Sequence, residues 1–255
     1  MFYEALGGGR FRSTVHTTGP WGSSTQHLGP PSALLAREME LLPSSVPMVI
    51  TRVTVEILGP VPVAELSVSA AVDRPGRSVE LLSAELSADG RVAARARAWR
   101  MVRSDTSAVA ADVDEPLAPP SSGTVLARPD NWGPGYLDVM EWRSLTGSFD
   151  EPGPATVWAR QTLPLVGGEE PTGLQRLLTV ADSGNGVSNR LDPRKWLFIN
   201  ADLTVHVYRD PVGEWIALDA ATAIGPDGVG TAASVLHDLT GPVGRGAQAL
   251  LVRPQ

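Results

Sequence analysis

The chain has 255 residues, of which 42% are hydrophobic and 19% charged, so it can build a packed core and is not globally disordered. A formal net charge of −7 and the lack of any basic run argue against a nucleic-acid-binding surface, and the absence of cysteine excludes disulfides and thiolate chemistry. Neither a signal-peptide core nor a run of ~20 apolar residues for a membrane span is present, so we expect a cytoplasmic protein.

The first half of the chain predicts a strand, a helix and then four strands. Residues 9–18 supply the leading strand. The prolines at positions 30 and 31 suit a helix start, an apolar stripe follows, and Pro43 ends it, so we expect a helix near residues 31–42. Period-2 alternation of apolar and polar residues predicts the four strands. These segments are residues 49–58, 64–72, 78–86 and 91–101.

An irregular segment separates this half from a second one of similar order. Residues 104–135 are rich in Pro, Ser, Gly and Asp without sustained periodicity, and we place a linker at residues 108–136. Residues 140–147 then predict a leading strand. Leucines at 174, 177 and 178 with Ala181 have helical spacing, which predicts a helix near residues 172–183. Four strand patterns follow, at residues 199–208, 214–222, 230–238 and 242–252.

The similar order of elements in the two halves indicates an internal duplication. Thr54 and Val55 recur as Thr204 and Val205, and the strands around them keep nearly the same offset. We therefore expect an α+β fold of two units, residues 1–107 and 137–255, each an antiparallel sheet wrapped around a central helix.

Three motifs carry a resemblance to a known family. They are "GPWGSSTQHLGPPSALLARE" (19–38), "FINADLTVHVYRDPVGEW" (198–215) and "DGVGTAASVLHDLTGPVGRGAQALLVRP" (227–254). In this order they resemble the thioesterase-like superfamily, related to acyl-CoA thioesterase II. The resemblance implies a double hotdog fold and hydrolysis of fatty acyl-CoA to free acid and CoA, with no metal and no organic cofactor. It also implies a catalytic set of Asp202, Thr222 and Gln248.

The residues themselves give reasons to consider these positions. Asp202 stands at the mouth of a strand, where Asp is disfavoured. Its counterpart in the first half is Arg52, and the counterpart of Gln248 is Arg97. This difference is expected if one half keeps the catalytic residues and the other only the scaffold, and random divergence at the surface explains it equally. Asp202 is a candidate general base or water anchor, and Gln248 a partner for the water. Thr222 is a candidate hydroxyl donor, although Thr is an ordinary strand residue.

The start of the first helix is the candidate oxyanion site. Free amides and the helix dipole favour negative charge there. Because Pro30 and Pro31 lack an N–H, the donors would come from Gly29 or its neighbours, and His27 lies beside them. We therefore expect His27 and Gly29 to bind substrate and to share a cavity with Asp202. An exposed loop histidine is the alternative.

Two other functions stay open. A hydratase or dehydratase on the same fold would need a histidine paired with an acid, for which His206 is a candidate. A hotdog protein that binds acyl-CoA or another hydrophobic ligand without turnover is the second. The four histidines show no metal spacing, and no G-x-S-x-G elbow is present. The sequence does not specify the length of the acyl chain, whether the thiol belongs to CoA or to a carrier protein, or whether the chain forms a homo-oligomer.

Overall fold

The computed structural model describes residues 1–20, 22–129, 132–149 and 151–255. The remaining positions, 21, 130, 131 and 150, fall in the first motif, the predicted linker and the second predicted unit, and lie outside the described residues. The described helices are α1 (Gly29–Glu40), α2 (Gly173–Ala181) and α3 (Gly184–Val187), with 3-10 turns η1 (Val15–Thr17), η2 (Ser107–Val109), η3 (Pro120–Ser122) and η4 (Tyr136–Val139). The strands are β1 (Tyr3–Gly7), β2 (Arg10–Ser13), β3 (Met48–Ile57), β4 (Glu65–Arg74), β5 (Val79–Ala88), β6 (Arg91–Val102), β7 (Thr124–Val125), β8 (Met140–Ser148), β9 (Glu151–Gln161), β10 (Trp196–Asn200), β11 (Asp202–Val207), β12 (Ile216–Ile224), β13 (Val229–Asp238) and β14 (Gly241–Pro254).

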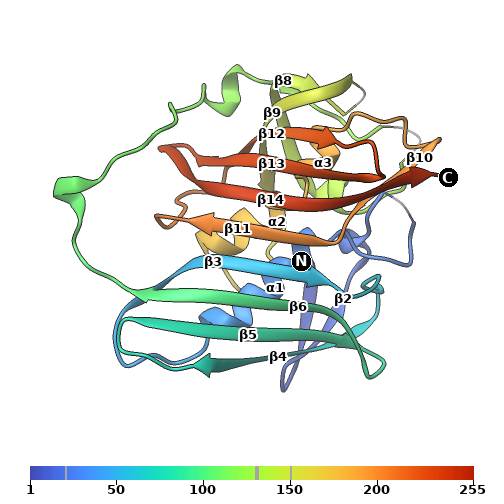
Figure 1. Ribbon diagram of the computed structural model, residues 1–255. Helices are drawn as coiled ribbons and strands as arrows, with labels where there is room; N and C mark the ends of the chain where they lie inside the picture. The colour runs from blue at the N-terminus through green and yellow to red at the C-terminus, as the bar shows by residue number, and fades with distance from the viewer. Residues whose placement is uncertain (21, 130–131, 150) are drawn as a thin grey trace.

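These strands form one antiparallel sheet. Its order is β1-β2-β4-β5-β6-β3-β11-β14-β13-β12-β9-β8-β7, with β10 paired to β14 (Figure 1). The sequence predicted two antiparallel sheets, one for each half. In the structure the two halves instead share a continuous sheet, because β3 of the first half pairs with β11 of the second.

The pairing of β3 with β11 is centred on the two residues that revealed the repeat. Thr54 lies opposite Thr204, and their hydroxyls are 3.2 Å apart. Val53 and Val55 lie opposite Val205 and Leu203, respectively. Equivalent positions of the two halves thus meet across a local two-fold axis, and the buried members of the pairs face the helices.

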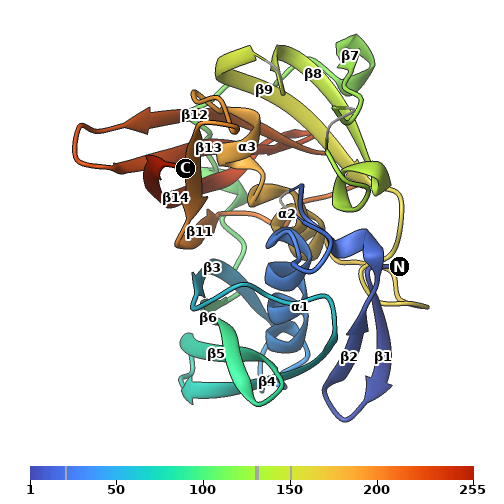
Figure 2. The same cartoon turned by 90° about the vertical axis from the view of Figure 1, so that its right-hand side faces the viewer.

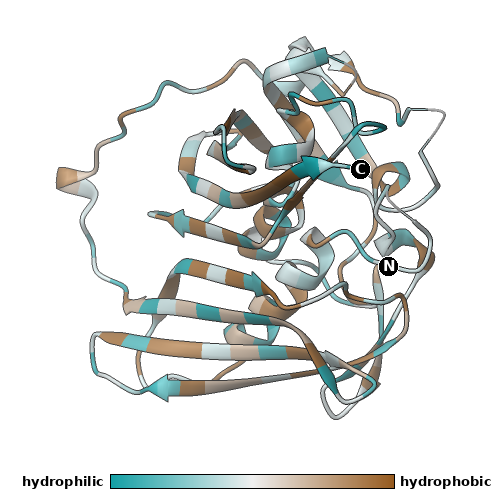
Figure 3. Ribbon diagram, turned by 45° about the vertical axis from the view of Figure 1, so that its right-hand side comes forward, coloured by the Kyte–Doolittle hydropathy of each residue, from teal (hydrophilic) through white to brown (hydrophobic). Residues whose placement is uncertain are grey.

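The helices α1 and α2 lie inside the curve of the sheet and contact each other (Figure 2). Apolar and polar residues alternate along the strands, as Figure 3 shows, so that one face of the sheet is buried against the helices. The contact between the helices is close at Gly29, where an added Cβ would lie 2.2 Å from the carbonyl oxygen of Thr179. No helix among the described residues is long and apolar enough to span a membrane.

The predicted helices and the leading strand at residues 140–147 are confirmed to within a few residues. Of the leading strand predicted at residues 9–18, only Arg10–Ser13 is a strand, and Val15–Thr17 forms a 3-10 turn. Four strands were missed. The missed strands are β1, β7, β9 and β10. β9 begins with Glu151, and the prolines at 152 and 154 gave its first residues the composition of a loop. β7 lies inside the predicted linker and pairs with β8, so part of that segment belongs to the sheet.

Gly29→Ala tests whether this glycine is needed for the close packing of α1 against α2. The new methyl group would meet the Thr179 carbonyl, and we expect overpacking to lower the free energy of unfolding by about 1–3 kcal/mol. Denaturant unfolding measures the change. The matched control is Gly22→Ala, where nothing lies within 4 Å of the added Cβ. Equal stability of the two variants would contradict the close helix contact.

Candidate functional site

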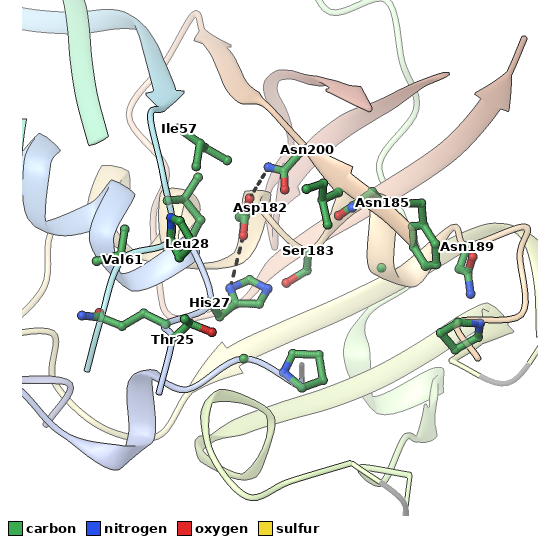
Figure 4. A pocket seen from close by; sticks show the side chains of 18 of the residues that line it. Thr25, His27, Leu28, Ile57, Val61, Asp182, Ser183, Asn185, Asn189 and Asn200 are labelled. Atoms are coloured by element: carbon green, nitrogen blue, oxygen red, sulfur yellow. Dashed lines mark hydrogen bonds and ion pairs between the residues drawn. The ribbon is translucent and has the colours of Figure 1, made fainter. Parts of the chain in front are cut away.

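A cavity of about 460 Å³ lies where the two halves meet. It is bounded by the segment before α1, the end of β3, the turn between α2 and α3, and the junction of β10 with β11 (Figure 4). Most of its walls are apolar. The apolar lining residues include Leu28, Ile57, Leu58, Val61, Trp132, Leu137, Trp142, Phe149, Val187, Phe198, Ile199 and Leu251. Among the described residues that line it, His27 and Asp182 are the ionisable side chains.

Asp182 is a buried carboxylate at the end of α2, with 5% of its surface exposed. The negative end of the helix dipole makes this an unfavourable place for an acid, and burial adds to the cost. Two side-chain amides offset it. Asn200 donates from Nδ2 to Oδ1 at 2.8 Å, and Gln248 donates from Nε2 to the same oxygen at 3.3 Å and to the Asp182 carbonyl at 3.0 Å. The other carboxylate oxygen, Oδ2, accepts from neither amide and is the one near His27.

His27 lies beside this carboxylate. Its Nδ1 is 3.3 Å from Asp182 Oδ2 (Figure 4). Its ring stacks on Tyr136 with centroids 4.0 Å apart. The backbone N–H of Gly29 donates to the same Nδ1 at 3.1 Å.

These two contacts require opposite protonation states of Nδ1. The nitrogen must be unprotonated to accept from the Gly29 N–H, and it must carry a proton to form an ion pair with Asp182. Burial lowers the pKa of His27, and the nearby Asp182 only partly opposes this shift. The neutral ring is therefore favoured, with Nδ1 accepting from Gly29 and the proton on Nε2.

Gln248 and Thr222 lie on the inner face of the sheet, in one row across three strands. Thr222 pairs with Ala232, which pairs with Gln248. Gln248 also accepts from the Asn185 N–H at 3.0 Å, whereas the Thr222 hydroxyl is 2.7 Å from that of Ser188. Both side chains thus hold the segment from α2 through α3. Neither is among the residues that line the cavity.

Asp202 lies elsewhere. It is the first residue of β11, and its Oδ1 accepts from the backbone N–H of Ala249 at 2.7 Å. Strand alternation places it on the face opposite the buried Leu203, across from Glu56. It is not among the lining residues, and neither is Gly29. The structure thus brings His27 and Gln248 together through Asp182 and does not bring Asp202 into that group. The catalytic role of Asp202 stays a prediction.

Sequence reasoning missed Asp182 and Asn200. The available signal for Asp182 was an acid at the C-terminal end of an apolar helix, where acids are unfavourable. Nothing in the sequence marked its contact with His27, because the two residues are far apart in the chain. Among the described residues, no cluster of three or more His, Cys, Asp or Glu side chains is arranged to hold a metal ion.

Two family models match this chain. The acyl-CoA thioesterase N-terminal domain matches residues 17–101, and the acyl-CoA thioesterase C-terminal domain matches residues 116–252. The chain belongs to the acyl-CoA thioesterase family. Comparison with curated proteins gives no match.

Solved structures share the fold of this acyl-CoA thioesterase family member. A hot dog fold protein of unknown function from Alicyclobacillus acidocaldarius is 17% identical with a TM-score of 0.76, and covers 98% of this chain and 95% of its own. A putative thioesterase from Novosphingobium aromaticivorans is 18% identical with a TM-score of 0.74, covering 98% of both chains. The tesB protein of Mycobacterium avium subs paratuberculosis is 15% identical with a TM-score of 0.69, covering 99% and 96%. At these identities the likeness establishes the hotdog fold.

The lowered pKa of His27 predicts how stability depends on pH. The folded chain binds less proton at this ring than the unfolded chain, so stability is lost as pH falls through the ordinary value of 6.5 toward the lower folded pKa. We expect the wild type to lose more unfolding free energy than His27→Gln between about pH 8 and about pH 5. Denaturant unfolding at each pH gives both curves. Parallel curves would contradict a buried neutral His27. The contribution of His237 to the pH dependence is the same in both proteins and cancels in the comparison.

Proposed function

We propose that this chain hydrolyses fatty acyl-CoA thioesters to free acid and CoA in the cavity between its halves. Family membership supports thioester chemistry. The observation that carries the proposal is the buried Asp182 carboxylate next to His27 in a mostly apolar cavity. Such a cavity accommodates an acyl chain, and the pair of Asp182 and His27 marks where the polar thioester would lie.

In this proposal, water attacks the thioester carbonyl carbon and Asp182 takes its proton. Oδ2 is the oxygen available for that proton, since Asn200 and Gln248 both donate to Oδ1. The neutral His27 ring donates from Nε2 to the carbonyl oxygen, which becomes an oxyanion in the transition state. Collapse of the tetrahedral intermediate breaks the C–S bond, and the leaving CoA thiolate takes the proton from Asp182, which returns to its carboxylate form.

Gln248 and Asn200 are positioning residues in this scheme. Their amides donate to the same carboxylate oxygen and so fix the position of the side chain. Thr222 acts indirectly, because its hydroxyl contacts that of Ser188 and so holds the segment that follows Asp182. Under the competing assignment, which the family resemblance supports, Asp202 is the base or water anchor, with Thr222 and Gln248 as its partners.

Comparing Asp182→Asn with Asp202→Asn decides between these carboxylates. Asn is nearly isosteric with Asp and keeps an acceptor oxygen, but it cannot take the proton of water. We expect Asp182→Asn to lower kcat by ~10²-fold or more, because a positioned base contributes ~10²–10⁴-fold. Asp202→Asn is expected to keep kcat within a few-fold. Single-turnover release of CoA from an acyl-CoA measures both.

A melting curve for each variant controls for loss of fold. The reverse result, with Asp202→Asn inactive and Asp182→Asn active at unchanged stability, would overturn the role of Asp182 and support the competing assignment. Full activity in both variants would overturn both mechanisms.

A hydratase or dehydratase is the second candidate, and one observation favours it. That chemistry needs a histidine near an acid, and His27 lies 3.3 Å from Asp182 within the cavity. The product distinguishes the two functions, since hydrolysis releases a free thiol whereas hydration changes the absorbance of an enoyl thioester and releases none. Binding of acyl-CoA without either product would support a ligand-binding protein.

We further propose that the chain is a cytoplasmic double hotdog with units at residues 1–107 and 137–255, joined by residues 108–136. The separate family matches on the two halves support two units. The local two-fold axis between β3 and β11 supports the same division.

A further inference from the structure

The mouth of the cavity lies where β10 pairs with β14. Ile199 and Leu251 both line the cavity, yet they are 41% and 46% exposed. They lie directly opposite each other in the β10–β14 ladder. Leu58, at the end of β3, lines the cavity from the other half and is 44% exposed. These three residues therefore mark the opening through which the thiol part of a substrate would leave the cavity.

Basic residues continue from this opening along one face of the β10–β14 ribbon. Arg253 follows Leu251 by two residues and pairs with Leu197, so strand alternation puts it on the face of Ile199 and Leu251. Lys195 is two residues before Leu197, and its carbonyl accepts from the N–H of Gln255, which extends the same register. At ~3.3 Å per residue, Lys195 is roughly 13 Å along the chain from Ile199.

A third basic residue lies on the opposite side of the opening. Arg91 begins β6, and its guanidinium approaches Gly59, with Nη2 3.6 Å from where a Cβ would be. Gly59 itself lines the cavity. The start of β6 and the end of β14 lie at the same side of the molecule (Figure 1).

The charge of Lys195 acts, after that of Arg194, on the nearby carboxyl of Asp192 and helps to lower its pKa. Among the described residues, Lys195, Arg253 and Arg91 form no ion pair, whereas their neighbour Arg194 is paired with Asp192. All three are exposed. Asp202 and Glu56, two acids of this sheet face, lie beyond Leu251 in the other direction. A chain with net charge −7 thus places three cations, including its single lysine, around one opening, and within the described part of the chain none of them is held in an ion pair.

We propose that Lys195, Arg253 and Arg91 bind the phosphate groups of CoA while its pantetheine arm passes through the opening. This inference rests on the proposed function, because it places the acyl group in the cavity. Cations on a flexible surface suit phosphates that stay solvated outside the protein. The thiol carrier is accordingly free CoA, whose phosphates reach the rim, and its ester is preferred over a pantetheine thioester without phosphate.

Binding of CoA and of pantetheine, measured by titration calorimetry, tests this site independently of turnover. Pantetheine has the same thiol arm and no phosphate. We expect the wild type to bind CoA more tightly, and the double variant Lys195→Gln/Arg253→Gln to weaken CoA binding at least fivefold. Each single variant, including Arg91→Gln, is expected to weaken it about two- to fivefold, as for exposed charged contacts. Pantetheine binding should not change, and higher salt should weaken CoA binding.

The matched control is Arg77→Gln, which removes an exposed positive charge in the turn between β4 and β5, at the other end of the sheet (Figure 1). Equal affinity of the wild type for CoA and pantetheine would overturn the proposal, as would equal losses in Arg77→Gln and the rim variants. A wild type that binds CoA through these residues but hydrolyses no thioester would overturn the proposed function and support the phosphate site.

Discussion

β3 and β11 pair antiparallel about Thr54 and Thr204, and this pairing relates the two halves by a local two-fold axis. It brings α1 and α2 together inside one sheet, with Gly29 pressed against the Thr179 carbonyl. The start of α1 thereby lies next to the end of α2. His27, just before α1, and Asp182, just after α2, come within 3.3 Å although each belongs to a different half. The candidate site is a consequence of how the halves are joined.

The same symmetry creates a second meeting of helix ends, and the two have diverged. At the end of α1, Glu40 accepts hydrogen bonds from the Thr172 hydroxyl at 2.9 Å and the Gln175 amide at 2.7 Å, and burial raises its pKa. At the end of α2, the acid instead faces an imidazole and an apolar cavity. One helix end holds its acid with partners that only stabilise structure, and the other pairs its acid with a group able to donate to a substrate carbonyl.

Local patterns predicted the helices and most strands, because period-2 and helical spacing are properties of short segments. The shared sheet was not predictable in this way, since pairing β3 with β11 depends on contacts between residues 150 positions apart. The site was predictable in part. His27 followed from its place at a helix start and Gln248 from the family resemblance. Asp182 did not, because its significance comes from Asn200, Gln248 and His27, which reach it from three other segments.

The central claim is that the thioester carbonyl lies beside His27 Nε2, next to the water that Asp182 activates. A crystal structure with an acyl-CoA analogue in which a methylene replaces the thioester sulfur tests it directly, since the carbonyl is retained but cannot be hydrolysed. The account predicts the carbonyl oxygen about 3 Å from His27 Nε2, with the acyl chain in the apolar cavity. A carbonyl bound beside Asp202 on the outer face of the sheet, with the cavity empty, would contradict it.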